Sequence, residues 1–401
     1  MTDLRPELRR DAPTDLSDVA EHPGLAARIR AEITELGPMP FARFMELALY
    51  DPEGGYYRSA EARPGRAGDF LTAPELHPIF GELLGRAIEQ VWDILGRPDP
   101  FLVQEHGAGE GAMAVPLLHA TSAAIHYAPV EIDQRRLAVL HERLDAAGLG
   151  DRLEPSPSAS FDGVVLANEV LDALPVHRLR RRDGVIRELG VDVDAGGTFV
   201  EAELPSRHDA AIDRLVAEGI ELVDGQTAEV CLDLDRWVAD AAGPLRRGLL
   251  LLIDYGAPAT ELYDPVRRRE GTLRAYLRHQ VSADPYRFVG RQDLTAHVDV
   301  TAVERAARAA GLERIGITTQ AEALMGLGIE ERLQAIQAHP ATTFEAYTLL
   351  RAALLRLLDP AAMGRFRVMA FGRDWPRDAE LDLFRYRVPL RTTAAPSGTH
   401  E

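Results

Sequence analysis

The sequence of 401 residues is poor in cysteine and in long apolar runs. Its single cysteine, Cys231, excludes an intrachain disulfide and a zinc site built on several cysteines, and it fits a reducing compartment. The longest apolar run, residues 249–253, is far shorter than a bilayer-spanning helix requires. We therefore expect no stable membrane insertion.

Positive charge is also scarce, because 45 basic residues, all of them arginine, face 63 aspartates and glutamates and give a formal net charge of −18. A field of that sign repels phosphate backbones, so we expect no nucleic-acid partner. Two basic clusters, residues 178–182 and 267–269, oppose this trend. The simpler interpretation is solvated arginines in loops or at strand ends; the alternative is a docking patch for an acidic partner.

The first residues are acidic, with Asp3, Glu7 and Asp11 among them. They match neither the apolar core of a secretory signal nor the acid-poor composition of a transit peptide. Together with the cysteine usage, this predicts a cytoplasmic location.

Hydrophobic residues make up 46% of the chain, which is enough for a large core. Helical periodicity over residues 22–36, 41–49 and 78–95 is followed by short apolar strands that alternate with helical patterns. That alternation predicts an α/β fold with a mostly parallel, doubly wound sheet. The predicted strands are 101–103, 127–132, 163–167, 249–253, 313–318 and 366–371, and the helices between them 112–120, 135–147 and 300–310.

The long gaps between strands predict insertions, the first with a hairpin at residues 185–200 that turns at 195–197. We expect a flexible arm (1–22), an N-terminal helical and lid segment (23–80), a Rossmann-like core (81–390) with insertions at about 178–232 and 257–298, and a disordered tail (391–401).

Three glycines, Gly107, Gly109 and Gly111, with Ala108 among them, separate the first strand from its helix. Such a turn lets a ligand approach the backbone and the helix N–H groups. The dinucleotide-binding pattern G-x-G-x-x-G/A is met formally, because Ala112 stands at its third fixed position. The methyl-donor pattern, in which Glu105 precedes the glycines, is met completely. An acid there suits a cationic amino group and sulfonium, so we expect S-adenosyl-L-methionine, with NAD as the alternative.

Further acidic residues follow the next two strands. Glu131 closes the second strand, where an acid accepts hydrogen bonds from ribose hydroxyls. Asp133 beside it is expected to be a helix N-cap. The third strand leads into Asn168, Glu169 and Asp172, at the place where acceptor and methyl donor meet in class I methyltransferases.

Several ordered blocks make the chain resemble the MidA family, known in mitochondria as the complex I assembly factor with arginine methyltransferase activity. The resemblance spans about residues 37–371. It rests on residues 37–38, 56–57, 68–75, 79–85, 167–177, 253–256, 293–299 and 325–329.

This resemblance implies a class I methyltransferase that modifies an arginine of a complex I-type protein subunit. It also implies that residues 69–75 form a lid over the cofactor pocket, which brings Thr72, Pro74 and Glu75 to the cofactor. The chain departs from the family pattern at Glu110, usually arginine, and at Ala73, usually serine.

Methyl transfer to arginine requires positioning for in-line attack and removal of a proton from a cationic guanidinium. Carboxylates in a forked arrangement suit both tasks. We expect Glu169 and Asp172, with Asp69 or Glu75 from the lid, to supply them. His177 and His297 are weaker candidates, because a lone histidine is more often structural. No cluster of histidine, aspartate and glutamate residues in the sequence has the spacing of metal ligands. The alternatives are another protein or small-molecule acceptor, a non-catalytic assembly protein, and an NAD-dependent oxidoreductase.

Overall fold

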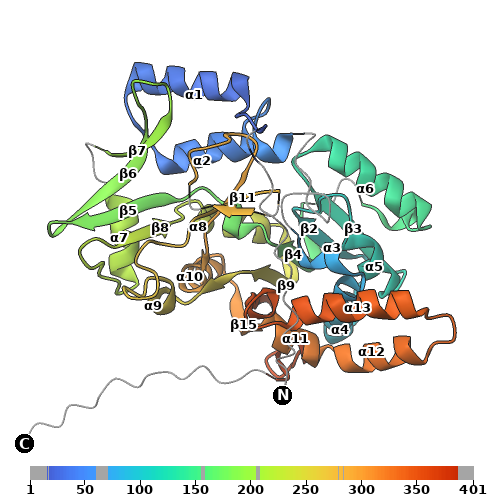
Figure 1. The fold of residues 1–401 in the computed structure, drawn as a ribbon. Helices are drawn as coiled ribbons and strands as arrows, with labels where there is room; N and C mark the ends of the chain where they lie inside the picture. Colours follow the sequence, from blue (N-terminus) through green and yellow to red (C-terminus); the bar gives the residue numbers. More distant parts are fainter. Residues whose placement is uncertain are drawn as a thin grey trace, which may run out of the picture.

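The computed structural model describes residues 16, 18–59, 71–154, 159–204, 208–278, 280–282 and 284–386 (Figure 1). Most of the predicted arm, the whole predicted tail, and Asp69 of the predicted lid lie outside the described residues.

A six-stranded sheet with the order β15-β16-β9-β4-β2-β3 forms the centre of the molecule. β3, β2, β4 and β9 are mutually parallel, and only β16 runs against the others. The α/β class predicted from the sequence is therefore confirmed. The strands are β2 (Phe101–His106), β3 (Ile125–Val130), β4 (Phe161–Asn168), β9 (Leu245–Asp254), β15 (Glu313–Thr319) and β16 (Arg367–Arg373).

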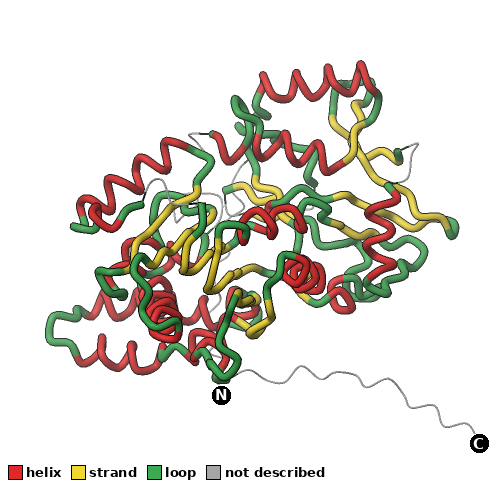
Figure 2. The backbone as a smooth tube through the Cα atoms, turned by 180° about the vertical axis from the view of Figure 1, so that it is seen from behind, coloured by secondary structure: helices red, strands yellow, loops and turns green. Residues whose placement is uncertain are grey.

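Helices cover both faces of this sheet, as Figures 1 and 2 show from opposite sides. Because side chains alternate along a strand, Val164 and Leu166 of β4 join one hydrophobic core, while Val165 and Ala167 join the other. The first core contains α4 (Ile79–Ile94), α5 (Ala114–His119), α6 (Gln134–Ala146), α11 (Gln320–Gly326) and α13 (Phe344–Leu358); the second contains α8 (Leu234–Ala242) and α10 (Val300–Ala309).

A second sheet has the order β1-β6-β5-β8, with β7 paired to β6. Its strands β5 to β8 lie between β4 and β9 in the sequence, and β1 comes from the N-terminal segment. The predicted hairpin is confirmed as β6 and β7, and Gly197 in its turn has φ +83°. A third hydrophobic core joins this sheet to α1 and α2. The elements are α1 (Pro23–Leu36), β1 (Met39–Pro40), α2 (Phe41–Tyr50), β5 (His177–Arg182), β6 (Val185–Val193), β7 (Phe199–Glu203), α7 (Asp209–Ala217) and β8 (Thr227–Val230).

The first basic cluster lies on β5 of this second sheet. Arg178 is only 8% exposed, and all four arginines at positions 178 and 180–182 form ion pairs with glutamates. Interpreting them as solvated loop or strand-end arginines is therefore wrong for Arg178, because strand pairing on both sides of β5 buries it. The interpretation fits Arg182, which ends β5 and has a side chain that is 64% exposed.

The connection from β9 to α10 folds back over the carboxyl end of the central sheet. It holds β10 (Gly256–Ala257), α9 (Ala259–Leu262), β11 (Arg274–Leu277), β12 (Gln280–Ser282), β13 (Asp293–Thr295) and β14 (Val298–Asp299). β11 pairs with both β12 and β13.

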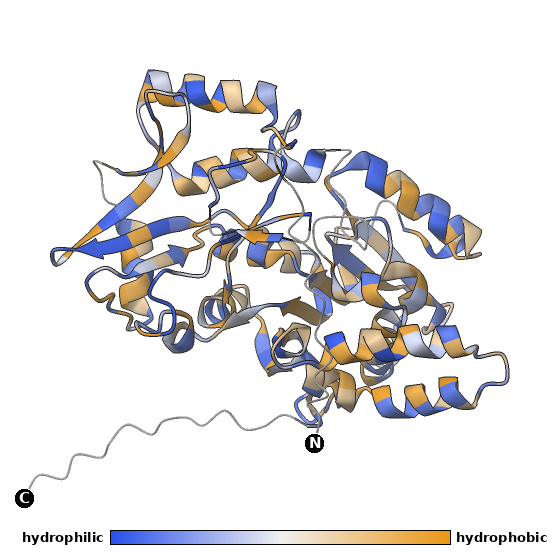
Figure 3. Cartoon of the chain, viewed as in Figure 1, coloured by the Kyte–Doolittle hydropathy of each residue, from blue (hydrophilic) through white to orange (hydrophobic). Residues whose placement is uncertain are grey.

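Three C-terminal helices were not predicted from the sequence: α11, α12 (Ile329–Ala338) and α13. α12 and α13 carry hydrophobic and hydrophilic residues side by side (Figure 3). Short helical turns complete the described chain: η1 (Tyr56–Arg58), α3 (Ala73–Leu76), η2 (Gly150–Arg152), η3 (Leu171–Ala173), η4 (Met363–Arg365) and η5 (Asp382–Phe384).

None of the helices in the described ranges is both long and apolar enough to cross a bilayer.

Candidate functional site

A cavity of about 1090 Å³ opens where β2, β3, β4 and β9 end. Ligands of open α/β sheets bind at this edge, because the loops after parallel strands converge there. The cavity is lined by most of the residues predicted for the site, namely Thr72, Pro74, Glu75, Glu105, Gly107, Ala108, Gly109, Glu131, Asn168, Glu169 and Asp172.

The glycine turn follows β2 and adopts the left-handed conformation at all three glycines. Their φ angles are +69° at Gly107, +55° at Gly109 and +81° at Gly111. Any residue with a Cβ atom would be strained in this conformation. A Cβ at Gly107 would lie 2.7 Å from Cγ2 of Val170. Gly111 does not line the cavity. A Cβ there would lie 3.0 Å from Cγ of Leu140, so the absence of a side chain lets α6 pack closely against the turn.

Glu131 lies one residue beyond the end of β3 and faces the glycine turn. Its Oε2 accepts a hydrogen bond from the Gly109 amide and its Oε1 one from the Asp133 amide, both at 2.9 Å. Asp133 caps α6, with its side chain accepting from the Arg135 amide at 3.0 Å, and this confirms its predicted role. The Glu131 carboxylate is thus held at the cavity wall by main-chain donors.

Glu105 lies at the floor of the cavity and is 3% exposed. The Tyr127 hydroxyl donates to its Oε2 at 2.6 Å. Burial raises the pKa of Glu105 to about 8, and the nearby charge of Glu131 acts in the same direction. A cation bound beside Glu105 would favour its ionised form, because opposite charges lower the pKa of an acid.

Glu169 follows β4 in a left-handed conformation, with φ +53°. Its Oε1 accepts hydrogen bonds from the Ala73 amide at 3.2 Å and from Nδ2 of Asn168 at 3.0 Å. Burial, and then the charge of Asp172, raise the pKa of Glu169 to about 8. The Ala73 main chain and the end of β4 therefore fix this carboxyl group together.

Asp172 lies beside a second buried acid, Asp254 at the end of β9. One oxygen of Asp254 accepts hydrogen bonds from the amides of Leu171 and Asp172, at 2.9 and 3.2 Å. Burial raises the pKa of Asp172 to about 6. Burial and the charge of Asp172 raise the pKa of Asp254 well above its ordinary value. Two neighbouring buried carboxyls resist ionising together, because the charge of one raises the pKa of the other.

Asp293, which we did not predict as a site residue, supplies another acid to the cavity. It is 2% exposed, and its Oδ1 accepts the Tyr57 hydroxyl at 2.8 Å. The Tyr57 ring stacks on Tyr50 at 5.6 Å, and the Tyr50 hydroxyl donates to the Ala173 carbonyl at 2.9 Å. Asp293 and Tyr57 lie in blocks noted above for the family resemblance, but nothing local in the sequence connects them.

The two candidate histidines differ in position. His297 lines the cavity, and its ring contacts Tyr255 edge-on at 5.0 Å. Burial, followed by the charges of Arg268, Arg365 and Arg274, lowers the pKa of His297 to about 3. It is therefore neutral near pH 7 and a poor proton acceptor.

His177 does not line the cavity. Its Nδ1 lies 2.7 Å from Oε1 of Glu188 within the second sheet, which fits the structural interpretation.

Two further acids that line the cavity, Glu75 and Glu110, each bind a neighbouring residue. Glu75 completes a capping box on α3 through the Thr72 amide at 3.2 Å, and burial raises its pKa. Glu110 forms an ion pair with Arg143 at 2.8 Å at the rim. Across the described ranges, no group of three or more His, Cys, Asp or Glu side chains is placed to hold a metal ion.

Residues 83–318 match the family described as "Putative S-adenosyl-L-methionine-dependent methyltransferase". The chain is 31% identical to the mitochondrial protein arginine methyltransferase NDUFAF7 homolog of Drosophila melanogaster over 388 residues, which cover 87% of this chain and 85% of the fly protein. It is 28% identical to mitochondrial protein arginine methyltransferase NDUFAF7 of Mus musculus, over 76% of this chain and 74% of the mouse protein.

A solved structure from Burkholderia thailandensis, bound to S-adenosyl-homocysteine, superposes on this chain with a TM-score of 0.81. It is 36% identical and covers 91% of this chain and 95% of its own. A native crystal structure from the same organism gives a TM-score of 0.80 at 35% identity, with the same coverage.

The relatives correct one expectation. The fly and mouse proteins are named as mitochondrial, which contradicts the cytoplasmic location expected from the acidic first residues and the single cysteine. Neither feature reports location directly: a composition that fits one reducing compartment also fits another.

Proposed function

We propose that this chain, which belongs to this S-adenosyl-L-methionine-dependent methyltransferase family, methylates an arginine of a protein. Its cofactor is S-adenosyl-L-methionine. The names of the fly and mouse relatives support arginine as the acceptor. A subunit of respiratory complex I is the protein that we propose, on the resemblance to the MidA family, and methylation there would serve complex I assembly.

The observation that carries this proposal is the set of acids at the acceptor end of the cavity: Glu169, Asp172 and Asp293 line it, and two of them are almost fully buried. Buried carboxyls are costly unless a cation or a donor satisfies them. A guanidinium does so with five N–H donors in a planar fork. An arginine side chain therefore fits the chemistry of this end.

The cofactor end fits the methyl donor. The buried Oδ1 of Asn168 has no hydrogen-bond partner among the described residues and suits a cationic amino group. Glu131 would accept the ribose hydroxyls, Glu105 would face positive charge, and Gly107 to Gly109 would let the cofactor approach the backbone, with Thr72, Pro74 and Glu75 covering it. When bound, the cofactor supplies an electrophilic methyl group for in-line transfer.

Glu169 is the group that we propose as proton acceptor. The acceptor nitrogen must lose a proton as its bond to the methyl carbon forms, since a protonated guanidinium has no free lone pair to offer. The Ala73 amide and Asn168 hold Glu169 in place for this transfer. A neighbouring guanidinium lowers the pKa of Glu169 and so ionises it once the acceptor is bound.

The test is to incubate the full chain with methyl-labelled S-adenosyl-L-methionine and purified complex I subunits, and to locate the label by mass spectrometry. We expect label on an arginine with the unaltered chain and none with Glu169→Gln. Label on another residue type would overturn the arginine proposal. Label confined to an arginine of an unrelated protein would overturn the complex I partner alone.

A further inference from the structure

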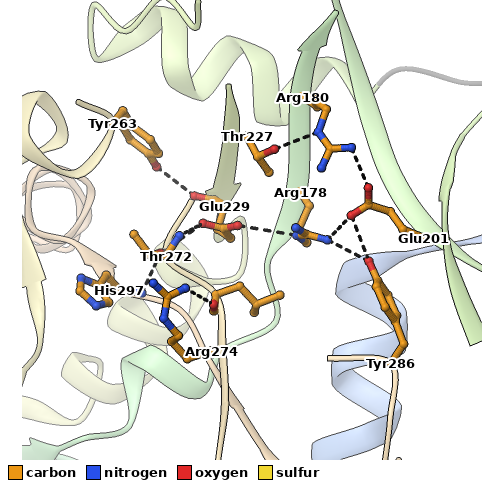
Figure 4. Close-up of polar contacts among 11 residues, drawn as sticks. Arg178, Arg180, Glu201, Thr227, Glu229, Tyr263, Thr272, Arg274, Tyr286 and His297 are labelled. Carbon is orange, nitrogen blue, oxygen red and sulfur yellow. Dashed lines mark hydrogen bonds and ion pairs between the residues drawn. The ribbon is translucent and has the colours of Figure 1, made fainter. Parts of the chain in front are cut away.

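Many arginines of this chain pair with acids, among them Arg143 at the cavity rim, which pairs with Glu110. Figure 4 shows Arg178 and Arg180 converging on Glu201, at 2.8 and 2.7 Å. Such pairing is expected in a chain with a net charge of −18, in which acids are abundant.

Three arginines are an exception, and we call them the arginine triad: Arg268, Arg274 and Arg365. Within the described part of the chain, none of them forms an ion pair. Arg274 donates to the main-chain carbonyl of Leu273 at 2.6 Å. Figure 4 draws Arg274 with its hydrogen bond to a main-chain oxygen, and Arg178 and Arg180 with their ion pairs to glutamate.

The fold places two members of the triad at the acceptor end of the cavity, and the third, Arg268, lies within electrostatic reach of His297 in the wall of this cavity. Arg365 lines it and comes two residues before Arg367, whose Cα pairs with that of Asp254 at the end of β9. Arg274 pairs in register with Thr295, another lining residue. The glycine turn, by contrast, follows β2, which is separated from β9 by β4.

Arg274 and Arg365 act on Arg268, and all three guanidinium groups act on His297. Burial and the charges of Arg365 and Arg274 lower the pKa of Arg268. The same three cations, after burial, lower the pKa of the His297 imidazole beside them. His297 therefore adds no charge of its own. Arg268 and Arg274 are half-buried, whereas Arg365 is exposed at the cavity. Like charges that lie close together repel each other, and a bound anion would relieve that repulsion.

We infer that the arginine triad is an anion subsite that binds a carboxylate side chain of the acceptor protein, close in sequence to the arginine that is methylated. This inference rests on the proposed function and makes it more specific. The acids Glu169, Asp172 and Asp293 would take the guanidinium, and the triad would take a neighbouring aspartate or glutamate. Acceptor segments with both charges would then be selected over purely basic ones.

The experiment measures binding of short fluorescein-labelled peptides by anisotropy, with S-adenosyl-homocysteine at saturation. Each peptide carries one arginine and one glutamate at a varied spacing, and is compared with its glutamine counterpart. The test variant is the triple change Arg268→Gln, Arg274→Gln and Arg365→Gln. The control, which removes the same charge, changes Arg267, Arg308 and Arg377 to Gln; these arginines are exposed and do not line the cavity.

At one or two spacings we expect the unaltered chain and the control to bind the glutamate peptide about tenfold more tightly than the glutamine peptide. The triple variant should lose this preference and keep its affinity for S-adenosyl-homocysteine. A preference that survives in the triple variant, or is absent from the unaltered chain, would overturn the inference. So would loss of S-adenosyl-homocysteine affinity in the triple variant, because the triad would then hold the cofactor.

Replacing the peptide arginine with citrulline separates this inference from the proposed function. If the glutamate preference persists while citrulline binds as well as arginine, the arginine proposal fails and the anion subsite stands. If arginine is preferred over citrulline but glutamate has no effect, the anion subsite fails and the arginine proposal stands.

Discussion

The two ends of the cavity are built in different ways. At the cofactor end, Glu105, the glycine turn and Glu131 come from one β-α-β segment, and main-chain amides hold the Glu131 carboxylate. At the acceptor end, Asp172, Asp293 and Arg365 come from three connections that are far apart in the chain. The cofactor end is therefore a local structure, whereas the acceptor end depends on how the second sheet and the β9–α10 connection pack.

This difference in construction predicts two different effects of mutation. A change at the cofactor end should weaken binding of the methyl donor, while a change at the acceptor end should slow transfer without weakening that binding. Glu169 lies where the two ends meet, since it is held by the Ala73 amide from α3 and by Asn168 at the end of β4.

The largest expected effect is that of Glu169→Gln. Glutamine keeps an oxygen that accepts from Ala73 and Asn168 but does not take up a proton, so we expect transfer to fall by about 1,000-fold. Calorimetry should find the affinity for S-adenosyl-homocysteine within about threefold of the unaltered chain, because one neutral acceptor replaces another. Parallel loss of transfer and affinity would assign Glu169 to the cofactor end instead.

The pH dependence of transfer tests the same residue without a mutation. Glu169 must be ionised to accept a proton, and burial raises its pKa to about 8. With S-adenosyl-L-methionine saturating, kcat/KM should rise about tenfold per pH unit below about pH 8 and then level. Any residual activity of Glu169→Gln should lack this rise. A profile already level at pH 6 would show that another group accepts the proton.

At the cofactor end we expect a smaller effect from Gly107→Ala. The left-handed φ and the 2.7 Å approach of a Cβ to Val170 would force the turn to shift, and affinity for S-adenosyl-homocysteine should fall about 10- to 100-fold. The matched control is Gly96→Ala, where φ is +80° but nothing lies within 4 Å of the added carbon. Equal affinity losses in the two variants would point to general destabilisation, which thermal unfolding would reveal.

The smallest effect should come from Glu110→Gln at the rim of the cofactor end. The side chains of Glu110 and Arg143 are 48% and 46% exposed, and exposed ion pairs contribute about 0–1 kcal/mol. Affinity for S-adenosyl-homocysteine should therefore change by less than about threefold in a calorimetric titration. A larger loss would show that this departure from the family pattern shapes the cofactor site.

The sequence by itself determined the central sheet and the cofactor end. Strand and helix periods, and the spacing from Glu105 to Gly111, are set within windows of a few residues, so a linear reading captures them. The N-cap at Asp133 and the turn at Gly197 were predictable for the same reason. The proposed boundaries between arm, lid segment, core and tail stay predictions.

Only the tertiary structure decided the acceptor end. The hydrogen bond from Tyr57 to Asp293 joins residues 236 positions apart, and no local pattern encodes it. The same holds for the two groups of arginines: strand pairing buries Arg178 among glutamates, whereas no carboxylate in the described ranges pairs with the arginine triad. Charge and residue type are written in the sequence, but partners and burial, which set pKa values and binding, follow from packing.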